Sequence, residues 1–447
     1  MLAAGLADGS NEANNYADTS GYVARNNPLR IDFPDTIMTE PNFWQPLAFD
    51  VLITQNGIPL EETTQTFLGV NWREVTPFAL NQPTSNTIAL DPGGPPQLGT
   101  ATDQDFKNQA IEVVAFSALL DPSQSEMIDI SPGALLNNPL GTNTGTGRAL
   151  NPVTGEAYVP NLVNHADYGR ILAEFWADGP DSETPPGHWN TLHNEITDDP
   201  QFERRYLGTG ELLDPLAWDV QAYLTINGAM HDAAIAAWTL KRQYDLARPV
   251  SMIRYLASKG QSSDPSGPSY SPEGIPLVTD LIEVITDSTI AEGQRHAHLS
   301  DHVGKIAVRA WAGEPGDIHN DVGGVAWITA ADWLPYQKST FVSPAFAAHI
   351  SSHSTFSRAS AEVMTLLTGS SFFPGGMGSF HFGAGEFLEF ENGPSIDVTL
   401  QWASYYDAAD QAGLSRLYGV IHIEADDWVL GSVLMHSAKP TICVTVR

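Results

Sequence analysis

Three short segments, far apart in the chain, carry residues whose types and spacing could do chemistry together. They are residues 241–249, 350–353 and 415–422, and each contains lysine, arginine or histidine side chains. Arginine and lysine neutralise an oxyanion, and arginine adds paired N–H donors. One histidine can bind or attack the central atom of a tetrahedral anion while another moves protons. The three segments together predict an oxyanion-binding site.

The first segment places its two cations in a defined relation to a helix end. Lys241 and Arg248 are seven residues apart, about two helical turns, so a continued helix would present both on one face. Because Pro249 disfavours helical geometry at Arg248, the helix should end nearby and leave Arg248 beside a pocket. Isolated lysines and arginines are usually solvated, and only the other two segments favour a site here.

The second and third segments add a helix start and a helix end. Ser351 and Ser352 suit N-cap positions, where unpaired N–H groups bind anions; plain helix capping with His353 on the surface is the alternative. A helix ending near residues 418–419 would leave His422 on the following loop, free to point inward. Four acidic residues could orient Arg416 or His422, or form exposed acidic surface: Asp407, Asp410, Asp426 and Asp427.

The order and spacing of these segments resemble the vanadium-dependent haloperoxidases and their relatives, the type-2 phosphatidic-acid phosphatases and bacterial acid phosphatases. The family signature is Lys, six residues, Arg-Pro; then Pro-Ser-Gly-His; then Ser-Arg, five residues, His. The first and third elements are complete here, whereas the second has Ile350 in place of Pro and Ser352 in place of Gly. The resemblance covers roughly residues 227–427.

This resemblance implies a vanadate cofactor, without haem, and a peroxidase that uses hydrogen peroxide and a halide ion to make hypohalous acid. It implies His422 as the ligand of vanadium, and His353 and Lys241 as the catalytic residues. The residues that it implies for holding vanadate are Lys241, Arg248, Ser351, Ser352, Arg416 and His422. Whether an organic acceptor is halogenated, and which one, is not indicated by the sequence.

Two alternatives use the same residues. In an acid phosphatase of the same superfamily, His422 would be the nucleophile and His353 the leaving-group acid, because a five-coordinate vanadate mimics the in-line transition state of phosphoryl transfer. In a catalytically silent anion-binding protein, the serine at position 352 would have spoiled the pocket.

Two aromatic residues favour the peroxidase. Trp238 precedes Lys241 by three positions and Phe346 precedes His353 by seven. Fungal-type chloroperoxidases look similar at both places, where aromatic residues line the halide side, so the two form the expected halide pocket; core packing is the alternative. His349 differs from the chloroperoxidase pattern, which leaves the halide preference open.

Charge and composition limit the possible partners. Lys and Arg total 21 against 53 Asp and Glu, a net charge of −32 that disfavours nucleic acid and anionic membranes. No apolar run is long enough to span a bilayer, and the first residues lack a signal-peptide pattern. We therefore expect a soluble protein, and the sequence does not indicate its cellular compartment. His296, His298 and His302 have a spacing that could bind a transition metal, but a helix start is the favoured interpretation.

The elements that must position the site are mainly helical. We expect one domain over residues 1–447, with a loop-rich wrap over 1–160 and a helical core carrying the site over 161–447. Apolar periodicity predicts helices over residues 105–120, 168–176, 218–245, 276–289, 300–312, 353–368 and 398–417. The fold class is therefore a helical bundle of the vanadium haloperoxidase and acid phosphatase type.

Overall fold

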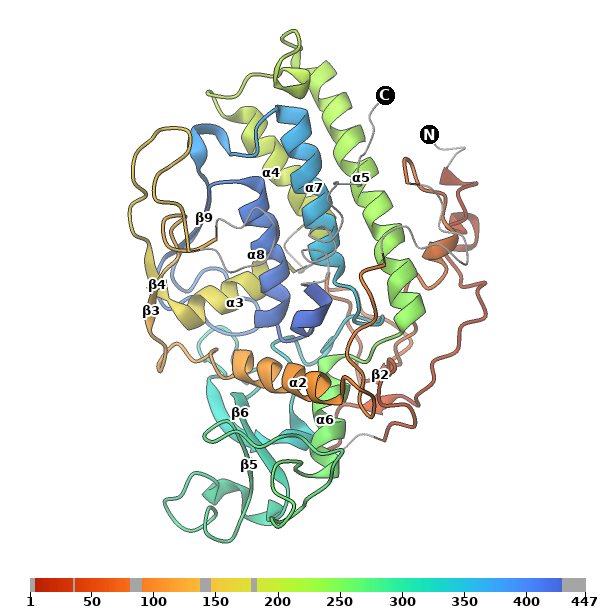
Figure 1. Ribbon diagram of the computed structural model, residues 1–447, viewed down its shortest axis with the longest axis vertical. Helices are drawn as coiled ribbons and strands as arrows, with labels where there is room; N and C mark the ends of the chain where they lie inside the picture. The colour runs from red at the N-terminus through yellow and green to blue at the C-terminus, as the bar shows by residue number, and fades with distance from the viewer. Residues whose placement is uncertain (1–4, 35–36, 81–90, 137–145, 178–182, 428–447) are drawn as a thin grey trace.

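A bundle of helices runs along the long axis of the molecule (Figure 1). The computed structural model describes residues 5–34, 37–80, 91–136, 146–177 and 183–427. Helix α7 packs against both α5 and α8, α4 packs against α5 and α7, and α3 packs against α8. Their bounds are α3 His165–Phe175, α4 Pro185–Asp198, α5 Pro215–Tyr244, α7 Ser352–Thr368 and α8 Tyr405–Tyr418. The expected mainly helical fold class is confirmed.

Local signals fix the ends of these helices. The Asp214 side chain accepts a hydrogen bond from the Ala217 N–H at the start of α5, and Asp245, in the left-handed region at φ 51°, ends it. Helix α8 begins with a capping box between Ser404 and Asp407. The long helix expected over residues 218–245 and the one expected over 353–368 are both present.

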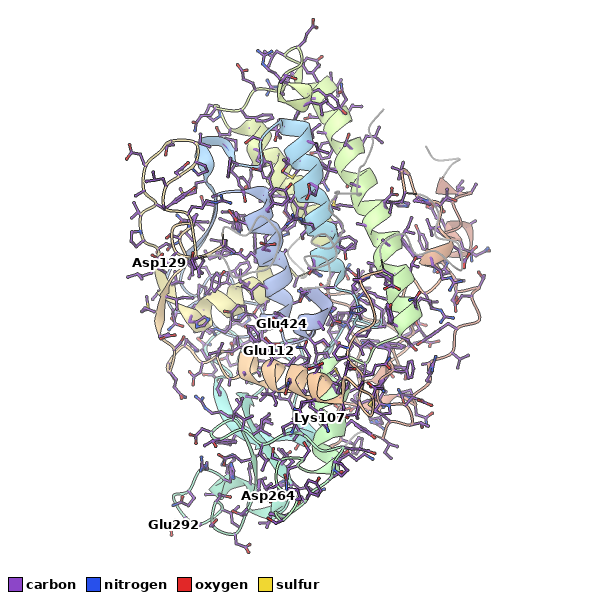
Figure 2. All side chains as sticks on the ribbon, viewed as in Figure 1. Lys107, Glu112, Asp129, Asp264, Glu292 and Glu424 are labelled. Atoms are coloured by element: carbon purple, nitrogen blue, oxygen red, sulfur yellow. The ribbon has the colours of Figure 1, made fainter. Side chains whose placement is uncertain are left out.

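Two further helices lie at the base of the bundle (Figure 1). They are α2 Asp103–Ser117 and α6 Pro249–Lys259. Lys107 is buried on α2 (Figure 2), where its ammonium donates to Asp103 at 2.7 Å and to the Pro272 carbonyl at 2.5 Å. The bond to Pro272 fastens α2 to the loop after α6. Among the described residues, no helix is both long and apolar enough to cross a membrane.

Within the described ranges, the strands form four small sheets. One is the parallel pair β1–β2, and the others are antiparallel: β3–β4, β5–β6–β7 and β8–β9. Their bounds are β1 Leu29–Arg30, β2 Leu47–Ala48, β3 Met127–Asp129, β4 Leu162–Asn164, β5 Ile282–Val284, β6 Ile306–Trp311, β7 Val325–Thr329, β8 Gly378–Phe382 and β9 Val398–Trp402.

Three of the expected helices are wrong in whole or in part. Residues 276–289 contain strand β5 and irregular chain, and residues 300–312 contain β6 after a 3-10 turn. Strand β6 is buried on nearly every residue, so its apolar run does not alternate, while its β-branched Ile306 and Val308 favour a strand. Residues 398–402 form β9, with alternate residues buried, and only from Tyr405 onward is the chain helical.

The N-terminal segment is tied to the bundle by polar contacts. The Asp232 carboxylate on α5 accepts the main-chain N–H groups of residues 78–80 at 2.7–2.9 Å. Gln65 donates to the Ser343 carbonyl at 2.7 Å, and the Trp44 N–H donates to the Asp245 carbonyl at 2.6 Å. These contacts support the proposal that residues 1–447 form one domain.

Candidate oxyanion-binding site

The three segments meet at one end of the bundle. Lys241 lies in the last turn of α5, Arg248 is the N-cap residue of α6, and Arg416 lies in the last turn of α8. All three cations are buried, and so is His422, on the loop after α8. His353, in the first turn of α7, shares a cavity with Ser352, Arg416 and His422.

Lys241 is held by main-chain oxygens. Its ammonium donates to the carbonyls of Ala347 and Ala348 at 3.0 and 2.9 Å. An ammonium has three N–H donors, so one is left for a ligand. Burial, reinforced by repulsion from Arg248, lowers the pKa of Lys241 well below its ordinary value. A bound anion would reverse this shift, because it stabilises the charged form.

Arg248 spans the loop before α7 and the loop after α8. Its Nε donates to the Phe346 carbonyl at 2.8 Å, and its Nη1 donates to the Ile421 carbonyl and to His422 Nε2, both at 3.0 Å. Its Nη2 is buried without a hydrogen-bond partner in the described part of the chain. Burial lowers the pKa of Arg248 to about 9, which means that its charge lacks full compensation.

Arg416 is even less well paired. Its Nε and Nη1 are buried, and no described residue accepts a hydrogen bond from either atom. Burial lowers the pKa of Arg416 to about 10. A buried donor without an acceptor is costly, and native proteins keep such groups mainly where a water or ligand completes them. These unpaired donors make Arg416 a candidate for binding an anion.

The tautomer of His422 is set by Asp426. The two residues are joined by a 2.8 Å contact between His422 Nδ1 and Asp426 Oδ2. Burial opposes ionisation of Asp426, but the imidazoles of His349 and His422 lower its pKa well below the usual range. Since the carboxylate accepts, Nδ1 carries the proton and Nε2 carries the lone pair. Burial and Arg248 lower the pKa of His422, so Nε2 is a neutral ligand or nucleophile.

His353 is oriented by a main-chain oxygen. Its Nε2 lies 2.9 Å from the Trp176 carbonyl, which can only accept, so this nitrogen bears the proton and Nδ1 is the free base. Burial, Arg416 and His422 lower the pKa of His353 well below its ordinary value. In this state His353 can take up a proton.

The two serines have different positions from those that the motif implies. Ser351 is the N-cap residue, and its hydroxyl oxygen accepts from Ser354, not from a group in the cavity. Ser352 lines the cavity, and its buried hydroxyl has no partner among the described residues. Its φ is not positive, so a serine in place of glycine causes no backbone strain.

Trp238 and Phe346 form one wall beside the lysine. Their ring centroids are 5.0 Å apart, and both rings line the cavity. The Lys241 ammonium lies 5.0 Å from the centre of the Phe346 ring and 6.0 Å from that of Trp238. The structure thus places both aromatic residues next to the predicted anion site.

The acidic candidates separate into two groups. Asp426 contacts His422, and Asp427 bonds to the hydroxyl of Ser354 in the first turn of α7. Asp407 caps α8 instead, and burial raises the pKa of Asp410, which is influenced by the charges of Arg358 and Asp407, to about 8. Of the four acidic candidates, Asp426 and Asp427 are the ones that contact the candidate site or the first turn of α7.

Two contributions were missed by sequence reasoning. His349 is fully buried, with Nδ1 3.4 Å from Asp426 Oδ1, and a lone histidine carries no signal for that contact. The Trp176 carbonyl is a main-chain group that no side-chain pattern reveals.

The histidines whose spacing could bind a transition metal make other contacts, at the start of a 3-10 helix over Ala297–His302. His296 contacts Thr289 at 3.0 Å, and His298 contacts the Trp327 carbonyl at 2.7 Å. Within the described ranges, no group of three His, Cys, Asp or Glu residues could hold a metal ion.

The chemistry of the donors fits a tetrahedral oxyanion such as vanadate. The unpaired groups of the described residues include N–H and O–H donors on Arg248, Arg416 and Ser352, and one carboxylate oxygen each of Asp426 and Asp427. Asp426 is the carboxylate held ionised. Burial raises the pKa of Asp427 to about 7, so it adds only partial negative charge at neutral pH. Ser352 and His353, the first residues of α7, line the cavity, and the start of a helix favours a bound anion.

The fold and these residues define a helical bundle with a candidate oxyanion site between its helix ends. Residues 221–432 match a family model described as "VCPO second helical-bundle domain". The chain has the fold of the vanadium-dependent haloperoxidases, and its residues 221–432 are similar to that domain family.

Solved structures agree with this assignment of the fold. An apo-type bacterial vanadium-dependent chloroperoxidase is 16% identical, with a TM-score of 0.56, over 94% of this chain and 63% of that one. The holo-type bacterial chloroperoxidase is also 16% identical, with a TM-score of 0.54, over 94% of this chain and 62% of that one. The chain thus spans less than two thirds of the length of either. A comparison with curated proteins found no match.

Proposed function

We propose that the protein is a vanadate-dependent haloperoxidase that oxidises a halide ion with hydrogen peroxide. The observation that carries this proposal is the set of buried, unpaired donors on Arg248, Arg416 and Ser352 beside a neutral imidazole nitrogen of His422. Such donors fit an anion whose central atom accepts a nitrogen ligand.

Each residue has a role that follows from its contacts. Lys241, Arg248 and Arg416 neutralise the anion, while the Ser352 hydroxyl and the first N–H groups of α7 bind its oxygens. His422 Nε2 provides the nitrogen ligand, after the 3.0 Å bond from Arg248 is shared or released. Vanadate, when bound, supplies a Lewis acid that activates peroxide without changing its own oxidation state.

His353 and Lys241 act on the substrates. The free Nδ1 of His353 accepts the proton that hydrogen peroxide gives up as it binds, because the Trp176 carbonyl keeps the proton of this residue on Nε2. The third N–H of Lys241 polarises the oxygen that the halide attacks. Trp238 and Phe346 supply a weakly hydrated wall where a halide can approach this oxygen.

The test uses metal-free protein in phosphate-free buffer, with and without orthovanadate. Oxidation of iodide, bromide and chloride by hydrogen peroxide is followed beside hydrolysis of p-nitrophenyl phosphate. We expect halide oxidation that depends on vanadate. Ester hydrolysis that vanadate inhibits, without halide oxidation, would make the protein a phosphatase with His422 as nucleophile. If the protein shows neither activity, the remaining alternative is an anion-binding protein without catalysis.

A further inference from the structure

His349 is a buried histidine to which the proposed function gives no role. It lies in the loop before α7, has no exposed surface and does not line the cavity. Its Nε2 lies 3.3 Å from the Gly93 carbonyl oxygen, and its Nδ1 lies 3.4 Å from Asp426 Oδ1. Neither Nδ1 nor Oδ1 has a hydrogen-bond partner among the described residues, so the contact between them is that of an ion pair. Both ring nitrogens therefore face an oxygen.

These two oxygens determine how many protons suit His349. A neutral imidazole has a single N–H, whereas a carbonyl and an ionised carboxylate can only accept. Whichever nitrogen lacked the proton would direct its lone pair at an oxygen. The imidazolium, with an N–H on each nitrogen, is the one form that matches both neighbours. The geometry therefore favours a positively charged His349.

The segment that covers His349 favours the same charge. The Tyr244 ring lies 5.2 Å from the His349 ring, and the Tyr244 hydroxyl donates to Asp91 at 2.6 Å. Burial opposes ionisation of Asp91, but hydrogen bonds from Tyr244 and Gly93, together with the charge of His349, lower its pKa. Two carboxylates, those of Asp91 and Asp426, thus stabilise a cation at this position.

Asp426 needs a cationic partner because it brings negative charge next to an anion site. Its other oxygen, Oδ2, contacts His422 Nδ1 at 2.8 Å and accepts from the Ile423 N–H at 3.2 Å. A carboxylate without a cation, separated from a bound oxyanion by one imidazole ring, would repel that anion, and such repulsion is strong where water is excluded. Paired with an imidazolium, Asp426 orients His422 without reducing the positive charge of the site.

We propose that His349 is a positively charged positioning residue, an inference that rests on the proposed function. Its charge compensates Asp426, so that Asp426 holds the proton of His422 on Nδ1 while the site keeps its attraction for an oxyanion. His349 itself touches neither the anion nor the reactants.

The first arm of the test measures the protons of His349 without vanadate, peroxide or halide. The full chain is labelled with nitrogen-15 in its histidines, and the chemical shifts distinguish an N–H from a bare ring nitrogen. Signals are assigned by their loss in His349→Gln and, as a matched control, in His381→Gln, which changes an exposed histidine on β8. At about pH 8 we expect two N–H nitrogens for His349 and a neutral ring for His381. A bare nitrogen on His349 overturns the proposal.

The second arm tests whether His349 acts through Asp426. Orthovanadate binding is measured by calorimetry for the wild type, His349→Gln, Asp426→Asn and the double variant. We expect His349→Gln to weaken binding about tenfold when Asp426 is present, and to have no further effect once this charge is removed. His381→Gln should bind as the wild type does, and thermal unfolding checks that all variants are folded.

Losses that multiply in the double variant overturn the compensation of Asp426 by His349, because a residue that only supports the fold weakens binding equally in both backgrounds. Equal binding by His349→Gln and the wild type also overturns it. If orthovanadate binds to none of these proteins, the proposed function fails, whereas the nitrogen spectra still decide the charge of His349.

Discussion

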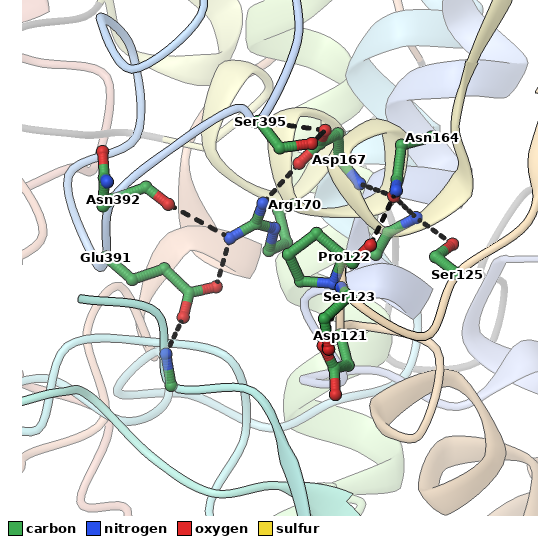
Figure 3. A network of polar contacts seen from close by, with 12 residues as sticks. Asp121, Pro122, Ser123, Ser125, Asn164, Asp167, Arg170, Glu391, Asn392 and Ser395 are labelled. Carbon is green, nitrogen blue, oxygen red and sulfur yellow. Dashed lines mark hydrogen bonds and ion pairs between the residues drawn. The ribbon is translucent and has the colours of Figure 1, made fainter. Parts of the chain in front are cut away.

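Two arginines, both almost completely buried, have opposite electrostatic surroundings. Arg170 on α3 donates from Nη1 to Glu391 at 2.9 Å and to the Asn392 carbonyl at 3.3 Å, and from Nη2 to Asp167 (Figure 3). Burial opposes its charge, but Tyr336, Glu391 and Asp167 raise its pKa. Arg416 makes no comparable ion pair with any described residue, and burial lowers its pKa to about 10. The charge of Arg170 is therefore compensated by neighbouring carboxylates, whereas we propose that the charge of Arg416 is compensated by a bound anion.

The acids around Arg170 are themselves fully engaged. Asp167 also accepts from the N–H and hydroxyl of Ser395, and Glu391 accepts from the Gly323 N–H at 2.5 Å. Only Nε of Arg170 lacks a partner in the described part of the chain. Such a network joins α3 to the loops that follow β6 and β8. Burial of a cation therefore does not by itself indicate its role. Whether its N–H donors have acceptors in the protein is the more informative property.

The largest effect on stability is expected at Arg170, whose charge is paired with buried carboxylates. Arg170→Leu leaves Asp167 and Glu391 as buried carboxylates without a cation, so the free energy of unfolding should fall by about 3–5 kcal/mol. Urea unfolding followed by circular dichroism measures this change. The control is Arg30→Leu, because Arg30 forms an exposed ion pair with Asp50 and should cost less than about 1 kcal/mol. Equal losses of unfolding free energy in the two variants would contradict the stabilising role of Arg170.

The second prediction concerns the unpaired cation. Arg416→Leu removes a buried charge that lacks an acceptor, so unfolding in phosphate-free buffer should be unchanged or shifted to higher temperature. Two charge-assisted hydrogen bonds to an oxyanion would be lost, which weakens orthovanadate binding by about 100-fold or more. Thermal shift against vanadate concentration measures both quantities. A destabilisation as large as that of Arg170→Leu would contradict the assignment of Arg416 to ligand binding.

The sequence predicted the residues of this site better than the contacts that orient them. Spacing and helix caps placed Lys241, Arg248 and His422 at helix ends, because those signals are local. The contact of His349 with Asp426 and the bond from His353 to the Trp176 carbonyl depend on tertiary packing, which no spacing encodes.

The fold shows the same division. The Ala-rich α5 has a long periodic pattern and was predicted well. Helices α4 and α6, each with Pro in its first turn, were not predicted, and β6 was taken for a helix because burial of nearly every residue removes its alternation. Short elements whose burial is decided by their neighbours carry too little local pattern.

A smaller effect on vanadate affinity is expected at Asp426, which contacts His422 and would not itself touch the anion. Asp426→Asn keeps an oxygen for His422 Nδ1 but removes the charge that fixes the tautomer, so vanadate affinity should fall about 10- to 100-fold. Isothermal titration with orthovanadate measures it. Asp410→Asn is the control, because burial raises the pKa of Asp410 to about 8 and the residue is largely neutral already. Equal affinities in both variants would show that Asp426 does not act on His422.

The smallest effect on stability is expected where two carboxyl groups lie side by side, in contrast to the unpaired arginine of the candidate site. Glu112 on α2 faces Glu424 (Figure 2), and burial together with this neighbour raises the pKa of Glu112 to about 7. A raised carboxyl pKa means that the folded state holds the proton more tightly, so the contribution of Glu112 to stability is greatest below pH 4.5 and falls as pH rises toward 7. Glu112→Gln should remove this fall.

The gain for Glu112→Gln should appear as a melting temperature that exceeds the wild-type value at pH 8 but not at pH 4.5. Solvent screens this partly exposed side chain, so the gain should stay below about 1 kcal/mol. Glu61→Gln, on an exposed side chain, should follow the wild type at both pH values. If Glu112→Gln also follows it, the two carboxyls do not repel each other.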